Sequence, residues 1–405
     1  MTRYEYVIVG GGMIADAAVK GIRELDRDGA VLVLGDDPEE PYTRPALSKL
    51  LWTDPSFTED KVPLGTADAE IRTGATVSAI DPEGKTVTVE GPSTGSGGTG
   101  ETLEYGALLI ATGGSPKTID LPAGDRVVYF RTFADYRHLR ELAAERPHVA
   151  VVGGSYIGTE IAAALVQNDV RVTLVVPDDT LREKVFPRPL AETFQRWFED
   201  AGVEIVTGTK VTGGTETADG VTLELDSGGT LEADAVVLGL GIEPNTALAE
   251  AAGLAVDDGV VVDEHLRTSN PSVYAAGDVA SYPDALLGRR RIEHVDLARK
   301  MGRAAGRQMV GDEAPFTYTP YFYSMVFGHR YEAVGDLDSR LDTVEAWAEP
   351  GAKGTVYYLD GDAVKGVLLW GNSSDAEPDA RDGAREVLAD PTGWTREQLA
   401  ERTLV

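Results

Sequence analysis

The sequence predicts an α/β protein with two similar parallel-sheet domains and a smaller C-terminal α+β domain. A short β-branched strand, a glycine-rich turn and an alanine-rich helix follow one another at residues 6–18 and again at 149–161. From about residue 315 the composition changes to aromatic, strand-like segments, and residues 377–401 are charged and helical. A chain of 405 residues has room for two or three domains of about 150 residues each.

The first glycine-rich turn has the pattern of a dinucleotide site. Gly10, Gly12 and Ala15 occupy the three small-residue positions of a G-x-G-x-x-G/A motif. The first residue permits the tight turn, the second lets a pyrophosphate approach the backbone, and the third lets helix and strand pack closely. Asp36 follows the next predicted strand, residues 30–34, near the spacing expected for a carboxylate that binds the adenosine ribose.

The second turn repeats this pattern with one substitution. Gly153, Ser155 and Gly158 take the three positions, so that serine replaces the middle glycine, and its hydroxyl has the chemistry to donate to a phosphate. The strand 170–176 lacks an acid at its end, and Asp178 is the nearest substitute together with its neighbour Asp179. Two such Rossmann-like motifs indicate either two bound dinucleotides or one ancient duplication.

Two further strands predict where the chain leaves a nucleotide domain. Residues 108–114 and 236–244 are apolar strands that end in small-residue turns, and these turns contain Thr112, Gly113 and Gly241. Between the motifs, residues 75–90 and 102–105 are predicted strands of a β-meander, joined by a flexible connection at 91–100.

A third strand, residues 273–279, ends in an acid, Asp278, of the kind that accepts hydrogen bonds from sugar-like hydroxyls. Together these segments predict three domains. The first is discontinuous and contains residues 1–122 and 247–314, the second contains 123–246, and the C-terminal domain contains 315–405.

Composition excludes several classes of function. The formal net charge of −30 argues against nucleic-acid binding, because the chain would repel phosphate backbones. The absence of cysteine excludes disulfides, thiolate nucleophiles and cysteine-ligated metals, and we expect no metal site. The 10 lysines against 27 arginines and the excess of acids are typical of proteins from molar salt, although a genome with an acidic bias would also explain them.

No targeting or membrane segment is visible. Residues 1–9 are too short and polar for a signal peptide, and the apolar runs fall far short of a membrane helix. We therefore expect a soluble cytoplasmic protein that does not bind membranes and is a monomer or a homodimer.

Four segments carry a resemblance to a known family. The order of motifs is similar to that of two-dinucleotide-binding-domain flavoproteins of the glutathione reductase type. Residues 36–49, which contain the element Arg44-Pro-Ala-Leu-Ser-Lys49, and residues 292–298 resemble the ferredoxin reductase and apoptosis-inducing-factor branch. Residues 331–338 and 354–370 lean toward the latter. The resemblance implies a glutathione reductase-like fold for FAD and NAD(P)H.

The resemblance also implies roles for individual residues. Lys49 is expected beside the flavin ring, Glu160 is expected to pair with it near the nicotinamide, and His294 is expected close to both rings. Lys49 and Glu160 could instead be a surface ion pair, and His294 a structural histidine. The residues expected to bind FAD are Gly10, Gly12, Ala15, Asp36, Arg44, Lys49, Thr112, Gly113, Asp278, Glu293, His294 and Tyr323. Those expected to bind the nicotinamide dinucleotide are Gly153, Ser155, Tyr156, Gly158, Asp178 and Gly241.

The chain departs from the family at two positions. Tyr323 stands where the family often has tryptophan, and a phenol stacks more weakly on a flavin or nicotinamide. Ala46 replaces the second proline of the Arg-Pro-Pro-Leu-Ser-Lys element.

Tyr156 agrees with the family, because it matches an aromatic residue that screens the flavin until the nicotinamide enters.

Three functions remain open from the sequence. Since a chain without cysteine cannot form the dithiol of the disulfide reductases, electrons must leave for another acceptor. The first hypothesis is an NAD(P)H-dependent reductase of a ferredoxin or rubredoxin. The second is a redox-sensing module with slow turnover, similar to apoptosis-inducing factor, and the third is an NADH oxidase or diaphorase.

The charges near these motifs give weaker indications. Asp178 favours NADH over NADPH, although Arg182 and Lys184 follow it closely. Residues 289–291 are three arginines and form a candidate docking face for an acidic ferredoxin, but three arginines in a loop also fit a solvated surface.

Overall fold

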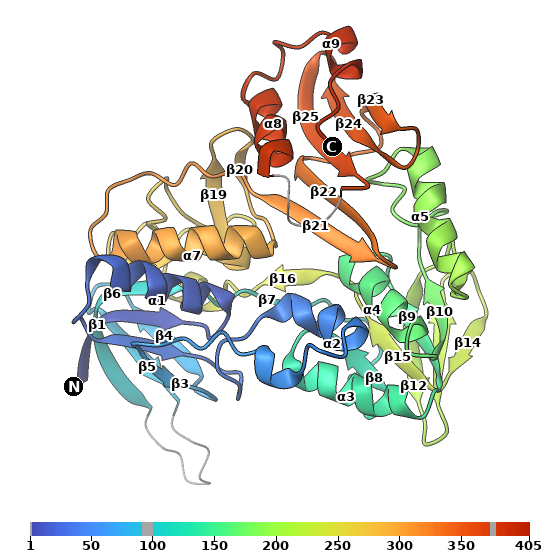
Figure 1. Ribbon diagram of the computed structural model, residues 1–405. Coiled ribbons are helices and arrows are strands. Elements are labelled where there is room, and N and C mark those ends of the chain that lie inside the picture. Colours follow the sequence, from blue (N-terminus) through green and yellow to red (C-terminus); the bar gives the residue numbers. More distant parts are fainter. Residues whose placement is uncertain (1, 91–99, 373–377) are drawn as a thin grey trace. The chain divides into compact units, whose positions relative to one another are not determined.

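The computed structural model describes residues 2–90, 100–372 and 378–405 (Figure 1). The chain forms two compact units. The first contains Met1–Arg44, Glu59–Ser115 and Glu243–Pro320, and the second contains Pro45–Thr58, Pro116–Ile242 and Tyr321–Val405. Each unit has a parallel sheet, and the second also has an antiparallel sheet with helices, so the predicted α/β class is confirmed.

The first unit is built on a sheet whose central strands are parallel. The parallel neighbours, in order, are β3 (Glu70–Arg72), β2 (Val31–Leu34), β1 (Thr2–Val9), β6 (Glu101–Ile110) and β18 (Val273–Ala275). β4 (Val77–Asp81) and β5 (Thr86–Val89) extend it as an antiparallel meander. β6 is long enough that its beginning pairs with β5 and its end pairs with β18.

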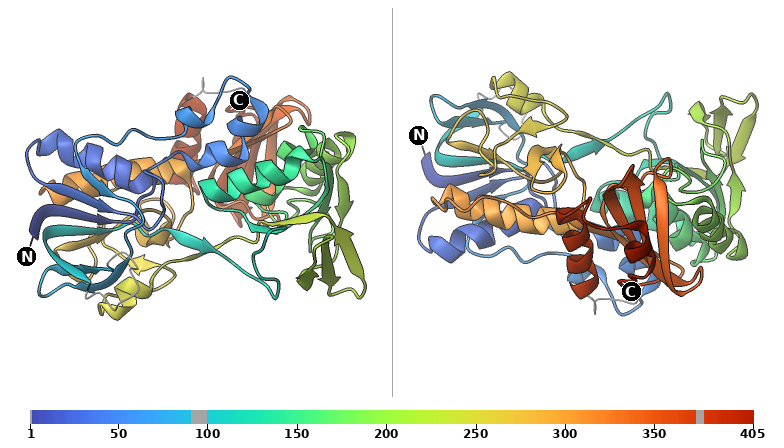
Figure 2. Two further views of the ribbon diagram at one scale, coloured as in Figure 1. Left: turned by 90° about the horizontal axis from the view of Figure 1, so that it is seen from below. Right: turned by 90° about the horizontal axis from the view of Figure 1, so that it is seen from above.

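Two helices of the first unit pack closely together, α1 (Met13–Leu25) and α7 (Val295–Met309), and lie side by side in both figures (Figures 1 and 2). The contact depends on small residues, because a Cβ at Gly306 would collide with the carbonyl of Ala18. The remaining elements of this unit are η2 (Glu59–Lys61), α6 (Ala247–Ala251), β17 (Val260–Val261), η3 (Gly277–Val279), β19 (Ala280–Asp284) and β20 (Gly288–Arg290).

The second unit contains a five-stranded parallel sheet. Its order is β11 (Glu204–Val206), β10 (Arg171–Val175), β9 (His148–Val152), β15 (Ala235–Leu238) and β8 (Val127–Tyr129). The helices of this part are α3 (Phe133–Ala144), α4 (Tyr156–Val166) and α5 (Arg188–Asp200). An antiparallel sheet of β12 (Val211–Glu216), β13 (Val221–Leu225) and β14 (Thr230–Ala233) follows.

The C-terminal part of the second unit is an antiparallel sheet with two helices. The sheet order is β21 (Tyr321–Val326), β22 (His329–Gly335), β25 (Ala363–Trp370), β24 (Lys353–Asp360) and β23 (Asp342–Glu349). The predicted helical segment at 377–401 is interrupted after residue 389, which gives α8 (Pro378–Ala389) and α9 (Arg396–Ala400). Thr395 begins α9 with a capping box, so the break is built into the sequence.

The chain crosses from one unit to the other at the ends of the two strands that were predicted to leave a nucleotide domain. β7 (Gly114–Pro116) and β16 (Ile242–Pro244) contain these boundaries, and the two short strands pair with each other. A further segment, Pro45–Thr58, belongs to the second unit and contains part of η1 (Arg44–Ser48) and all of α2 (Leu50–Thr53). Within that unit the ring of Trp52 meets the ring of Tyr136 edge-on at 5.6 Å.

Most of the flexible connection predicted at 91–100 lies outside the described residues. The antiparallel pairing of β5 with β6 on either side of it confirms the predicted meander. In the described ranges, no helix is both long enough and apolar enough to cross a membrane.

Candidate functional site

The first glycine motif lies where β1 ends and α1 begins, as predicted. Gly10 has φ +118°, and a Cβ there would collide with the carbonyl of Ala111, so only glycine fits. Gly12 is the N-cap of α1, no side chain caps the helix, and a Cβ at Gly12 would meet nothing within 4 Å. Ala15 is fully buried. The result is open space over uncapped backbone N–H groups, which suits a phosphate group.

Further predicted residues follow the carboxyl ends of three other parallel strands of this sheet. Asp36 follows β2 and is exposed to solvent. Asp278 lies in η3 just after β18, and Gly113 follows β6 with φ +62°. Thr112 is held in place, because its hydroxyl donates to the carbonyl of Asn245 at 2.9 Å.

The residues expected to lie near the rings divide between the two units. In the first unit, Arg44 lies over the ring of Tyr42 at 5.2 Å. Glu293 forms an ion pair with Arg291 at 2.7 Å, and a second N–H of Arg291 donates to the backbone carbonyl of Asp278 at 3.2 Å. Lys49, Tyr156, Glu160 and Tyr323 belong to the second unit.

His294 is the N-cap of α7, and burial lowers its pKa from 6.5 to about 4, although the Asp278 carboxylate opposes this shift. The imidazole is therefore neutral at physiological pH. A neutral ring remains able to donate and accept hydrogen bonds, but it adds no positive charge to this part of the unit.

The pKa of His294 predicts a pH-dependent loss of stability. Because the unfolded chain binds the proton more readily, wild-type stability falls as the pH drops from 6.5 toward 4. In His294→Gln we expect the loss between pH 6.5 and 4 to be smaller by about 3 kcal/mol. Urea unfolding at several pH values measures it, with His138→Gln on α3 as a control. Identical pH dependence of wild type and His294→Gln would contradict the assignment.

The second glycine motif connects β9 with α4. Gly153 has φ +112°, and a Cβ at Gly158 would collide with the carbonyl of Gly153, so both glycines are required. Ser155 differs from expectation, because its hydroxyl donates to the carbonyl of Gly239 at 2.7 Å and is therefore already engaged. Gly241 has φ +89° and a Cβ there would lie in open space.

Asp178, predicted to select the dinucleotide, is half-buried after β10 and pairs with Lys184 at 2.5 Å. Arg182 does not join them. Its guanidinium lies 4.0 Å from the centre of the Tyr156 ring and 5.7 Å from that of Phe186. Its Nε and Nη2 atoms are buried, and no described residue accepts a hydrogen bond from them.

The strongest polar centre of the second unit is the carboxylate of Glu160. The side chain is 3% exposed, and its Oε2 atom accepts from Lys49 Nζ at 2.6 Å and from Ser48 Oγ at 2.7 Å. Its Oε1 atom accepts from Ser324 Oγ at 2.8 Å. Glu160 is buried and the Lys49 side chain is only 14% exposed, which argues against the alternative of a surface ion pair.

Two aromatic residues accompany this centre. Lys49 Nζ lies 5.8 Å from the centre of the Tyr323 ring, and Arg330 lies over the same ring at 4.5 Å. Tyr156 meets Phe322 edge-on at 5.3 Å, and burial raises the pKa of Tyr156. The structure thus brings together four of the predicted residues, Lys49, Tyr156, Glu160 and Tyr323, within one unit.

Sequence reasoning missed Ser48 and Ser324. Each is the immediate neighbour of a predicted residue, Lys49 and Tyr323, and this adjacency is the signal that the sequence contains. Their convergence on Glu160 spans 112 and 164 residues of chain, which no local pattern reveals.

The arginine cluster at 289–291 does not present three open cations. Arg289 donates to the carbonyls of Val262 and Ser281, and Arg291 pairs with Asp258 and Glu293. The cluster therefore contributes hydrogen bonds and ion pairs to its own unit, and a docking role for it stays a prediction.

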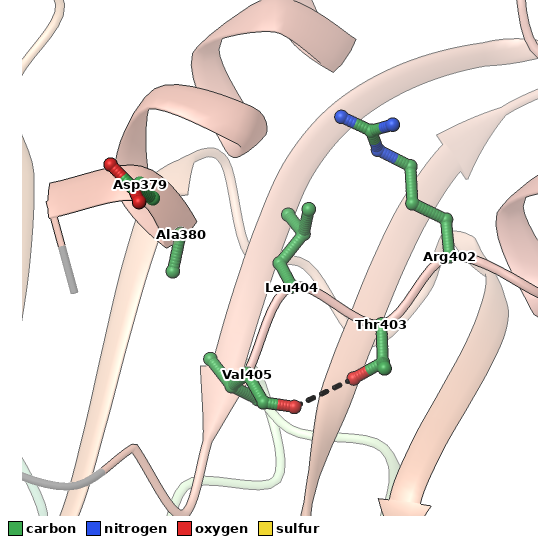
Figure 3. Close-up of a pocket in the computed structure, with 6 residues that line it drawn as sticks. All are labelled: Asp379, Ala380, Arg402, Thr403, Leu404 and Val405. Carbon is green, nitrogen blue, oxygen red and sulfur yellow. Dashed lines mark hydrogen bonds between the residues drawn. The ribbon is translucent and has the colours of Figure 1, made fainter.

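No group of three or more potential metal ligands occurs in the described parts of the chain. A shallow pocket of about 510 Å³ lies beside α8 and the C-terminal tail (Figure 3). Its lining contains none of the predicted site residues, and its Arg402 already pairs with Glu386.

Comparison with known proteins agrees with this geometry. A family model described as pyridine nucleotide-disulphide oxidoreductase matches residues 4–302. Apoptosis-inducing factor 1, mitochondrial, of Dictyostelium discoideum is 32% identical, over 91% of this chain and 76% of the relative. The ferredoxin–NAD(+) reductase component of the anthranilate 1,2-dioxygenase system of Burkholderia cepacia is 33% identical, over 89% of each chain.

Among solved structures, the covalent putidaredoxin reductase–putidaredoxin complex matches with a TM-score of 0.84 and 28% identity, covering 96% of this chain and 94% of the other. The family model spans more than half of the sequence, and the similarity to the two relatives extends over nearly all of it. The chain belongs to the pyridine nucleotide-disulphide oxidoreductase family.

Proposed function

We propose that the protein is an FAD-dependent NAD(P)H oxidoreductase that passes electrons to a ferredoxin-type carrier. The observation that carries this proposal is the pair of Lys49 with the buried Glu160 beside Tyr323, in a chain without cysteine. The similarity to two ferredoxin-type reductases supports the same activity. The family name refers to disulphides, but this chain has no thiol of its own and must deliver electrons elsewhere.

The residues of the first unit fit FAD. The open space at Gly12 over the N-terminus of α1 suits the pyrophosphate, and we propose that the exposed Asp36 accepts from the adenosine ribose. The other residues of this unit proposed to hold FAD are Gly10, Ala15, Arg44, Thr112, Gly113, Asp278, Glu293 and His294. Lys49 and Tyr323, from the second unit, are also proposed to hold it. FAD, when bound, supplies the ability to accept a hydride and to release electrons singly.

The chain's own residues then position the reactants and adjust the local charge. Lys49 supplies a positive charge where electrons arrive, and Glu160 holds its ammonium in place. Tyr156 and Tyr323 offer aromatic faces for stacking, and Tyr156 would have to move for a nicotinamide to enter. Gly153, Ser155, Gly158 and Gly241 are proposed to line the path of the nicotinamide dinucleotide.

NADH is the proposed donor. Asp178 is placed after β10 to accept from ribose hydroxyls, whereas Arg182 is turned onto Tyr156 and Lys184 is neutralised by Asp178. We expect Asp178→Ala to lower kcat/KM for NADH about tenfold and to raise it for NADPH, because Lys184 becomes available to a 2′-phosphate. Anaerobic stopped-flow reduction with each nucleotide measures both effects.

A matched variant separates the two charges of this pair. Lys184→Ala should leave NADH use within about twofold of wild type and weaken any remaining use of NADPH. A wild-type protein with a strong NADPH preference would contradict the proposal.

The experiment that tests the function begins with anaerobic reduction of the purified protein by NADH. Rapid reoxidation by an added ferredoxin, and only slow reoxidation by oxygen or cytochrome c, supports the reductase. A long-lived long-wavelength charge-transfer band with slow electron release and dimerisation would favour a redox sensor, the second candidate suggested by the apoptosis-inducing-factor relative. Rapid turnover with oxygen alone would favour an NADH oxidase.

We further propose that the protein works in a salt-rich cytoplasm. The support is the net charge of −30 and the preference for arginine over lysine, since at about 1 M salt the Debye length is only ~3 Å and like charges hardly repel. Rubredoxin as an alternative carrier and a monomeric or homodimeric state remain predictions.

A further inference from the structure

The carboxylate of Glu160 is surrounded by more donors than an ion pair requires. Lys49 and Ser48 both reach Oε2, whereas in the described part of the chain Ser324 is the only residue that donates to Oε1. Both serines are buried, at 3% and 1% exposure. The two hydroxyl hydrogen bonds to this carboxylate are therefore made inside the protein, and the Lys49 side chain is only 14% exposed.

A buried carboxylate needs these donors for a physical reason. An ion pair alone does not compensate the desolvation of both charges, and the remaining lone pairs must also be satisfied. Hydrogen bonds to a charged group are stronger than those between neutral groups, and an oxygen left without a donor is costly. Ser324 therefore matters more than Ser48, because Oε2 retains Lys49 when Ser48 is lost.

The acceptor and its donors come from three separate segments, and Lys49 directly follows Ser48 on one of them. Ser48 ends η1, Glu160 lies on α4, and Ser324 lies on β21. Because Ser324 directly follows Tyr323, its hydrogen bond to Glu160 also holds the strand that carries the tyrosine ring beside Lys49. One carboxylate thus fixes the ammonium and the aromatic residue together.

We propose that Ser48 and Ser324 are positioning residues for Lys49. Their hydroxyls hold Glu160 in the one orientation that keeps the Lys49 ammonium beside Tyr323. This inference rests on the proposed function, since it assumes that the ammonium serves hydride transfer. It extends the reactive centre from two residues to four.

The test compares Ser324→Ala and Ser48→Ala with a rescue variant, Ser324→Thr, which retains the hydroxyl. The matched control is Thr222→Ala, which removes an exposed hydroxyl–carboxylate hydrogen bond to Glu232 elsewhere in the second unit. Stopped-flow reduction by NADH gives the limiting rate and the apparent Kd for NADH. Acetylation followed by mass spectrometry gives the labelling rate of Lys49, with Lys20 as the internal reference.

We expect the limiting rate to fall about tenfold in Ser324→Ala and about threefold in Ser48→Ala, in line with the loss of one hydrogen bond to a charged group. The apparent Kd for NADH should stay within about twofold, because the hydroxyls act through Lys49 and not on the dinucleotide. Labelling of Lys49 should rise about fivefold in Ser324→Ala, because a less constrained ammonium is more accessible. Ser324→Thr should restore both rate and labelling, and Thr222→Ala should change neither.

The outcomes separate this inference from the function on which it rests. If wild type is reduced by neither NADH nor NADPH, the proposed function fails. If wild type is reduced and Ser324→Ala matches it in limiting rate and Lys49 labelling, the positioning role is wrong. The positioning role would also be wrong if Ser324→Ala and Ser324→Thr both had a lower melting temperature than wild type but unchanged Lys49 labelling.

Discussion

Replacing Gly12 with aspartate should abolish FAD binding and leave the protein folded. Gly12 has φ −95°, which any residue adopts, and a Cβ there would meet nothing within 4 Å, so the side chain costs little in the protein itself. The carboxylate would occupy the space over the N-terminus of α1 that we assign to the pyrophosphate, and like charges in that space repel. We expect the Kd for FAD to rise at least about 100-fold.

The measurement is reconstitution of flavin-stripped protein with FAD, followed by flavin fluorescence, with circular dichroism to monitor folding. Gly12→Ala is the control for size, and we expect a rise of only about tenfold in Kd because a methyl group adds bulk without charge.

Gly10→Ala should destabilise the protein itself, unlike the two Gly12 variants. It would lower the stability of the protein by about 1–3 kcal/mol, because its φ of +118° and the Ala111 carbonyl both exclude a side chain. Normal FAD affinity in Gly12→Asp would place the cofactor elsewhere.

The contrast between Gly10 and Gly12 also indicates what the sequence can predict. The motif assigns both glycines to one turn because their spacing is local, and the structure places them between β1 and α1. The second motif was equally predictable in position, but the direction of the Ser155 hydroxyl was not. Its partner, the Gly239 carbonyl, lies 84 residues away and is brought close by parallel pairing of β9 with β15.

The polar centre around Glu160 depends even more on contacts between residues that are far apart in the sequence. The resemblance named Lys49 and Glu160, but the burial of the pair and its serine donors depend on three distant segments meeting in one unit. The contact of Arg182 with the Tyr156 ring is equally invisible to the sequence, in which Arg182 follows Asp178 and leaves NADPH open as a donor. Local motifs therefore predicted where the two glycine-rich turns lie, and long-range packing decided the environment of each charge.

Replacing Lys49 with methionine should slow reduction by NADH about 100-fold, the effect expected when one charged group at a reacting centre is lost. Methionine retains much of the length and packing of the side chain but removes the ammonium 2.6 Å from Glu160. The same variant should be less stable by about 3 kcal/mol, because the Glu160 carboxylate would remain buried without a counter-charge. Stopped-flow absorbance and urea unfolding measure the two effects.

The double variant Lys49→Met/Glu160→Gln distinguishes a functional cation from a structural ion pair. Since it removes both charges, the buried carboxylate no longer destabilises the protein, and most of the lost stability should return. Reduction by NADH should remain slow, because the positive charge beside Tyr323 is still missing. If the double variant recovered the wild-type rate together with its stability, Lys49 would serve only the packing of α4 against the 45–58 segment, and another residue would have to supply the charge.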